Sequence, residues 1–109
     1  MKKIRPRKKY ARRFEHIHVE QQLLHRGAPY ARKAVAKAFG KVLKEVRAEH
    51  GYSQEELAAI AEMDRTYPSL MERGKRTPTL WVVFNIASVF HIRARYLIDR
   101  TEAKLQLRA

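Results

Sequence analysis

The side chains best suited to binding chemistry are cations gathered at the start of the chain. Eight of the first 14 residues are lysine or arginine, and residues 1–33 hold 11 such cations against two acids, whereas the other 76 residues hold 13 against nine. Charge placed this unevenly is typical of chains that bind nucleic acids or an anionic membrane surface. We predict that a basic arm over residues 1–29 contacts phosphates regardless of base sequence; the alternative is that it is only solubilising. The predicted phosphate contacts of the arm are Lys2, Lys3, Arg5, Arg7, Lys8 and Lys9.

Little else in the chain suggests metal or covalent chemistry. The sequence has no cysteine, which excludes disulfides and thiolate metal sites, and His16, His18 and His25 have no cysteine or pair of acids beside them. No glycine-rich phosphate loop and no nucleophile with a matching base is recognisable. We therefore expect no metal, no cofactor and no enzymatic activity.

The hydropathy of the chain gives no sign of a membrane or secretory segment. The longest strongly apolar run, LWVVF at residues 80–84, is far too short to span a bilayer. The basic start is not followed by the apolar stretch of a secretory signal. We expect a cytoplasmic, nucleoid-associated protein with no membrane partner.

The secondary-structure elements predicted after the basic arm are helices. An apolar stripe with helical spacing lies between Pro29 and Gly51, which are suitable residues to open and to close one helix. A second stripe follows Thr79, a good N-cap, and a last short helix is predicted over Ala94–Asp99. The first stripe is Val35, Ala38, Phe39, Val42, Leu43 and Val46, and the second is Leu80, Val83, Phe84, Ala87 and Phe90.

Two shorter helices are predicted between these longer ones. Ser53 and Glu56 have the spacing of a capping box, which opens a helix reaching about Ala61. The next helix is predicted over about Arg65–Arg73, with Asp64 as its N-cap and Gly74 after its end. Pro68 then becomes the fourth helical residue and removes only one terminal hydrogen bond. A start at Thr66 or later is the alternative, because a proline disfavours helical geometry in the residue before it.

These segments predict the architecture. No segment alternates with the period of a strand, so the fold class is all-α, a compact five-helix domain over residues 30–101 with a short tail over residues 102–109. Two short helices joined by about three residues, over about residues 53–73, favour a helix-turn-helix unit.

Specific residues then connect the chain to a known family. From Phe39 to Leu97, about 60 of the 109 residues, the sequence resembles the Cro/phage-repressor (XRE) type of helix-turn-helix domain, and it resembles bacterial regulators that include restriction–modification controller proteins. The resemblance implies a lambda-repressor-like fold that binds double-stranded DNA. It is carried by LKEVRAEHGYSQEELA (43–58), RTYPSLMERGKRTPTL (65–80) and IASVFHI (86–92).

The resemblance also implies roles for single residues. The helix over residues 65–73 would enter the major groove and read base edges through Arg65, Thr66, Ser69 and Leu70. Gln54, Arg73, Lys75 and Arg76 would contact phosphates. Arg47 and Glu72 would form a buried salt bridge that sets the angle of this helix. Pro68 stands where the family usually has a branched aliphatic residue, and we expect it to pack in the same place; a tolerated irregularity is the alternative.

The helix after Thr79 suggests how the protein assembles. If the second stripe faces the core, Trp81, Val82, Asn85 and Val89 form an outer patch that is too apolar to stay uncovered. We expect a homodimer through this patch, with residues 105–107 as an addition, since repressor-type domains bind two half-sites as symmetric dimers. The alternative cover is the segment Val19–Leu24.

The function predicted from these observations is sequence-specific transcriptional regulation on double-stranded DNA, as a repressor or an activator. The alternative is a protein-bridging coactivator or an antitoxin-type protein, for which a protein partner matters more than DNA. A third hypothesis is RNA binding through the arm. Sequence selectivity separates the first from the second, because a regulator needs specific binding about a thousandfold tighter than binding to random DNA.

Overall fold

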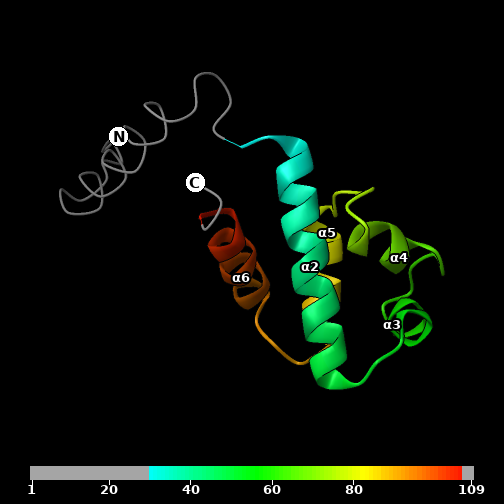
Figure 1. Cartoon of the computed structure of the whole chain (residues 1–109). Helices are drawn as coiled ribbons and strands as arrows, with labels where there is room; N and C mark the ends of the chain where they lie inside the picture. The colour runs from blue at the N-terminus through cyan, green and yellow to red at the C-terminus, as the bar shows by residue number, and fades with distance from the viewer. Residues whose placement is uncertain (1–29, 107–109) are drawn as a thin grey trace, which may run out of the picture. The chain divides into compact units, whose positions relative to one another are not determined.

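The structure, a computed structural model, describes residues 30–106 as five helices: α2 (Arg32–His50), α3 (Gln54–Ile60), α4 (Tyr67–Glu72), α5 (Leu80–Val89) and α6 (Ala94–Gln106). The long helix α2 stands at the centre, with α6 on one side and α3 and α4 on the other (Figure 1). No residue of this part of the chain is in a strand, so the all-α five-helix prediction is confirmed. None of the helices between residues 30 and 106 is long and apolar enough to cross a membrane.

Local signals in the sequence account for four of the helix ends between residues 30 and 106. Ser53 Oγ accepts the N–H of Glu56 at 3.0 Å and the Glu56 carboxylate accepts the N–H of Ser53 at 2.8 Å, so the predicted capping box opens α3. Thr79 caps α5 as predicted, by accepting the N–H of Val82. The glycines predicted to end helices have φ of +75° at Gly51 and +73° at Gly74. Such left-handed residues let the following N–H groups satisfy the last carbonyls of a helix.

The ends of α3 and α5 use the same geometry without glycine. Glu62 and His91 have φ of 56° and 57°, and the N–H groups of Met63 and Ile92 bond carbonyls five residues back, at 3.0 Å in both cases. The sequence carried little signal for these two ends, because residues other than glycine seldom adopt a positive φ, although histidine does so more often than most.

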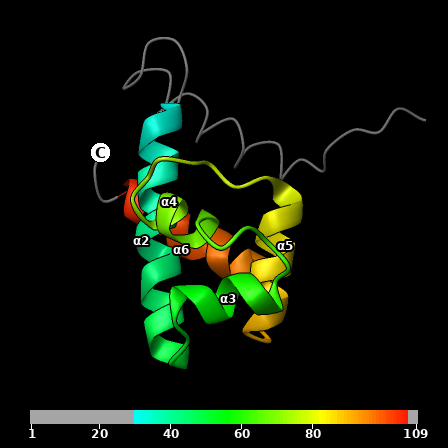
Figure 2. The same ribbon diagram turned by 90° about the vertical axis from the view of Figure 1, so that its right-hand side faces the viewer.

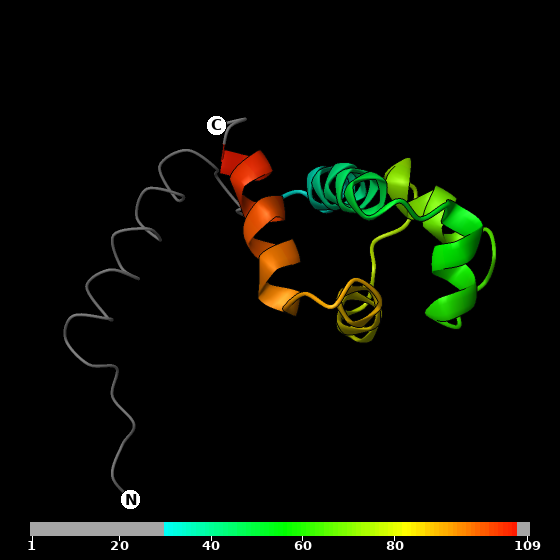
Figure 3. The ribbon, with the colours of Figure 1, turned by 90° about the horizontal axis from the view of Figure 1, so that it is seen from below.

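The core lies between α2 and the four shorter helices. In Figure 2 the helices α3 and α4 lie in front, with α2 and α5 at the two sides. Seen from below in Figure 3, α5 lies across from α2. Apolar side chains from all five helices pack into one core cluster. The most deeply buried residues are Val42, Leu43, Val46, Leu57, Met71, Ile86 and Leu97.

The buried face of α5 differs from the prediction. Leu80 and Phe84, expected in the core, are 69% and 57% exposed, whereas Val82 and Val89, expected outside, are 6% and 8% exposed. Nearly every residue of α5 is apolar, so two stripes with helical spacing were available in its sequence. Packing against α3 and α6 selects the stripe Val82, Val83, Ile86, Ala87, Val89 and Phe90.

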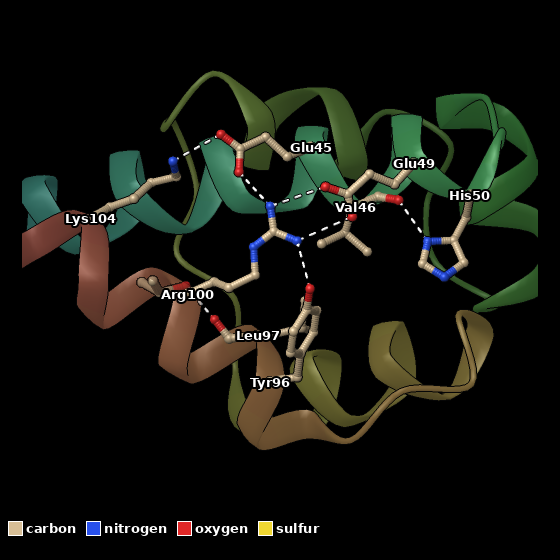
Figure 4. Close-up of polar contacts among 9 residues, drawn as sticks. Glu45, Val46, Glu49, His50, Tyr96, Leu97, Arg100 and Lys104 are labelled. Carbon is tan, nitrogen blue, oxygen red and sulfur yellow. Dashed lines mark hydrogen bonds and ion pairs between the residues drawn. The ribbon is translucent and has the colours of Figure 1, made fainter.

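The last helix is longer than predicted. α6 continues past Asp99 to Gln106, so the first five residues of the predicted tail are helical. Arg100 joins it to α2: its guanidinium lies 2.7 Å from Glu45 Oε1 and 3.2 Å from Glu49 Oε1 (Figure 4). Lys104 adds a contact of 2.9 Å to the other Glu45 oxygen. The hydrogen bonds with Glu49 raise the pKa of Arg100, and those with Lys104 lower the pKa of Glu45.

Several predictions concern residues outside the described part of the chain. They are the arm over residues 1–29, with its six phosphate contacts, the three histidines His16, His18 and His25, the Val19–Leu24 cover and the end of the tail. These remain predictions.

Candidate nucleic-acid interface

The helix predicted to read bases is shorter than expected at its start. α4 begins at Tyr67, so Arg65 and Thr66 lie in the turn before it and Pro68 is its second residue, not its fourth. A proline at that position loses no helical hydrogen bond, because the first N–H groups of a helix have no partner within it. The Pro68 ring is fully buried, as the packing interpretation predicted. Pro68 therefore anchors the start of α4 in the core.

A polar network fixes α4 against α2 and α3. Arg47 Nε and Nη2 donate to the two carboxylate oxygens of Glu72 at 2.6 and 2.9 Å, as the resemblance implied. The Gln54 amide also donates to Glu72 Oε1, at 2.9 Å, and Arg47 Nη1 donates to the Tyr52 carbonyl at 2.8 Å. The side chains of Glu72 and Arg47 are only 4% and 16% exposed, and the bonds to Glu72 raise the pKa of Arg47. We call Arg47, Glu72 and Gln54 the α4 network.

Near this network, the backbones of α2 and α4 are in contact. Gly40 is buried where the two helices meet, and a Cβ atom placed on it would overlap the carbonyl oxygen of Met71. The same atom would lie 2.9 Å from the carbonyl oxygen of Glu72. The absence of a side chain at Gly40 thus sets how closely α4 approaches α2.

The four predicted base-reading residues lie together around the start of α4. Arg65 and Thr66 are exposed, whereas Ser69 and Leu70 are half-buried. The backbone N–H and the hydroxyl of Thr66 both donate to Asp64 Oδ1, at 2.8 and 2.6 Å, and these bonds lower the pKa of Asp64. Since its hydroxyl hydrogen is in use, Thr66 can offer a base only its oxygen as an acceptor and its methyl group. The Asp64 side chain thus bonds Thr66 within the turn before α4 and is not the N-cap of the helix; Thr66 occupies the N-cap position.

The predicted phosphate-binding residues are in two places. Arg73, Lys75 and Arg76 are exposed just beyond α4, and none of them forms an ion pair within residues 30–106. Gln54 lies at the start of α3, but its amide is engaged with Glu72, so only its carbonyl oxygen and second amide hydrogen stay available to a ligand. Gln54 had no predicted part in the α4 network, because its separation from Glu72 in the sequence left no signal for it. The bond from Arg47 to the Tyr52 carbonyl was not predicted either.

The comparison with known families agrees with the arrangement of α3 and α4. The sequence profile of the helix-turn-helix family matches residues 43–97, which are half of the chain and include both helices and the α4 network. The chain belongs to the helix-turn-helix family.

Relatives of this helix-turn-helix protein agree with that assignment. An uncharacterized HTH-type transcriptional regulator of Archaeoglobus fulgidus is 39% identical over 51 residues, which are 47% of this chain and 73% of that one. The uncharacterized HTH-type transcriptional regulator y4dJ of Sinorhizobium fredii is 30% identical over 66 residues, 61% of this chain and 86% of that one. Among solved structures, the restriction–modification controller protein C.AhdI from Aeromonas hydrophila is 37% identical, with a TM-score of 0.55 over 57% of this chain and 94% of its own.

Family and fold together make this helix-turn-helix protein a DNA-binding transcriptional regulator. The bridging or antitoxin alternative is not favoured, since both matched relatives are described as regulators.

Proposed function

We propose that this protein reads a two-part operator in double-stranded DNA, with the start of α4 in the major groove. The observation that carries the proposal is the α4 network, which holds α4 in one orientation while Arg65 and Thr66, in the turn before it, stay exposed. A fixed orientation matters, because bidentate contacts to base edges require the side chain to arrive at one angle.

In this arrangement each base-reading residue has its own chemistry. Arg65, exposed in the turn before α4, donates to guanine O6 and N7. Thr66 offers an acceptor oxygen or a contact of its methyl group with thymine, and Ser69 offers a hydroxyl one turn later. Leu70 offers only apolar contact.

The phosphate contacts hold the protein in register without reading sequence. We assign them to Arg73, Lys75 and Arg76, with Gln54 at the start of α3 and the basic arm as further contributors. Cations beyond the end of α4 would neutralise phosphates beside the bases that are read, and the arm would add contacts that do not depend on base sequence. The DNA itself would lie in the cytoplasm at the nucleoid, which is where we propose that the protein acts.

A homodimer supplies the second half-site. Leu80, Trp81 and Phe84, which we call the α5 patch, are 69%, 63% and 57% exposed and lie within two turns of one helix. Exposed aromatic and leucine side chains gathered on one helix are typical of a protein contact. A two-fold contact through this patch would join two copies of α4, and helix-turn-helix dimers bind half-sites about one DNA turn apart.

Selection of bound duplexes from a random-sequence pool tests the proposal. We expect an enriched sequence that the wild-type protein binds about a thousandfold or more tightly than a scrambled duplex of equal length. Arg65→Ala should lower this ratio, whereas Lys75→Ala should weaken binding to both duplexes alike. A ratio near one for the wild type would contradict sequence-specific regulation and favour the bridging alternative. Competition by single-stranded RNA would reveal RNA binding through the arm.

A further inference from the structure

A row of lysines along α2 has no part in the site described so far. Lys33, Lys37, Lys41 and Lys44 are exposed and recur every three or four residues, so they share one face of the helix. With Arg32 they are the only charged residues among the first 13 of α2. We call these four lysines the lysine row.

No acid within the described residues neutralises the lysine row. None of its members forms an ion pair or a side-chain hydrogen bond between residues 30 and 106. The acids of α2, Glu45 and Glu49, point to α6 and are bound there by Arg100 and Lys104, as Figure 4 shows. The positive charge on this side of α2 therefore stays free to act on a ligand.

The placement of these cations is unfavourable for the helix itself. Arg32 and Lys33 lie in the first turn of α2, where the helix dipole favours acids, and that turn contains none. Lys33 with Lys37, and Lys37 with Lys41, are like-charged pairs four residues apart, which destabilise a helix. An arrangement that lowers helix stability in several places indicates a use outside the folding of α2.

The lysine row is continuous with the phosphate contacts assigned above. A Cβ atom on Gly74 would lie 3.3 Å from the Cα of Lys37, so the residue that ends α4 rests against the row. Lys75 and Arg76 follow Gly74 directly. The row and this loop thus form one basic surface that extends from the end of α4 along α2.

We propose that the lysine row binds phosphates of the same DNA duplex outside the bases that α4 reads, and so extends the interface without reading sequence. The spacing suits this ligand: lysines four residues apart are about 6 Å apart along a helix, and two phosphate steps of one DNA strand cover about 7 Å of its axis. The inference rests on the proposed function, since α4 must first bring a duplex to this side of the molecule.

The test uses the full chain and two charge-matched variants. Lys37→Gln/Lys41→Gln removes two cations of the row, and Arg93→Gln/Arg95→Gln removes two exposed cations next to the start of α6 as the control. Because the first variant also relieves like-charge repulsion, we expect it to fold at least as stably as the wild type in urea. Fluorescence anisotropy at several salt concentrations follows binding to the enriched duplex, with flanking sequence on both sides, and to its scrambled counterpart.

We expect the slope of log K against log salt to become shallower by about 1.8 in the Lys37/Lys41 variant, since each lost phosphate contact removes about 0.9. The loss should be the same on both duplexes, and the control should keep the wild-type slope. A Lys37/Lys41 variant with the wild-type slope would overturn the proposal. So would weaker binding to phosphatidylserine vesicles with unchanged DNA binding, which would assign the row to a membrane surface.

The two proposals can fail separately in this experiment. If the wild type does not distinguish the two duplexes, sequence-specific regulation fails, and a shallower slope in the lysine variant would then show that the row binds phosphates without base reading by α4. If the wild type is selective and the slope does not change, only the inference about the row fails.

Discussion

Gly40 of α2 lies directly against the backbone of α4 at Met71, with no room between them for a side chain. The contact joins the longest helix of the domain to the helix that we propose to read bases. The position of α4 is therefore set by backbone contact as well as by the α4 network.

Gly40→Ala tests this contact. In an ordinary helix interior the change would stabilise by about 0.5–1 kcal/mol, because alanine favours a helix more than glycine does. Here the added methyl group must push α4 away, and we expect a loss of about 1–3 kcal/mol in urea unfolding together with weaker operator binding. The exposed Ala48→Gly in the same helix reports helix propensity alone. Higher stability in Gly40→Ala would show that the helices separate without loss.

Removing the Glu72 carboxylate should leave the partly buried Arg47 cation without its ion-pair partner. Glu72→Ala leaves Arg47 and Gln54 without their acceptor, and breaking a buried pair costs about 3–5 kcal/mol. We expect the lower end of that range in urea unfolding, since the Arg47 side chain is 16% exposed. A loss below about 0.5 kcal/mol would mean that the pair behaves like a surface ion pair.

The double substitution Arg47→Met with Glu72→Leu replaces the whole ion pair by apolar side chains. Apolar side chains of similar size can replace a buried ion pair at little cost, so much of the lost stability should return. The recovery should be incomplete, because the Tyr52 carbonyl loses its donor, Arg47 Nη1. Operator affinity should stay low even where stability returns, since the orientation of α4 is no longer held by hydrogen bonds.

Acid should weaken the contact between α2 and α6 through Glu45. Its pKa is lowered from the ordinary 4.5 by the hydrogen bond from Lys104, by Arg100 and by the charges of both. A carboxyl whose folded pKa lies below its unfolded pKa stabilises the fold above the unfolded value, and this contribution is lost as pH falls through the folded value. We therefore expect Glu45→Gln to be less stable than wild type at pH 7, by about 0.2–1 kcal/mol as for surface pairs.

The pH dependence separates this effect from a simple loss of packing. Below pH 4.5 the difference between wild type and Glu45→Gln in urea unfolding should shrink toward zero. Glu102→Gln, at an exposed acid of α6 that forms no ion pair within residues 30–106, is the matched control and should show little effect at either pH. A Glu45→Gln difference that persists at low pH would contradict the ionic origin.

Trp81→Lys should separate the proposed dimer. A lysine in the α5 patch places two like charges near the two-fold axis and removes an aromatic contact, while the exposed position tolerates it. Sedimentation should then show a folded monomer with most operator affinity lost. Ile98→Lys, which places the same charge at a 45% exposed apolar residue of α6, should remain a dimer. A wild type that is monomeric at micromolar concentration would contradict the proposal.

What the sequence determined by itself was local. The capping box of Ser53 and Glu56, the glycines after α2 and α4, and the Thr79 cap each depend on residues within a few positions of one another. The interactions that decide these helix ends are therefore visible in a short window of sequence. The family resemblance added the Arg47–Glu72 pair, which spacing alone would not have shown across 25 residues.

Tertiary structure decided which faces of the helices are buried and how far α6 extends. Every position of α5 but two carries an apolar residue, so helical spacing permitted more than one buried face, and contact with α3 and α6 left Leu80, Trp81 and Phe84 outside. The extra turns of α6 are supported by Arg100 and Lys104, whose partners are more than 50 residues away in the sequence. Burial and ion pairing of this kind arise only between helices already packed together, so no local pattern could predict them.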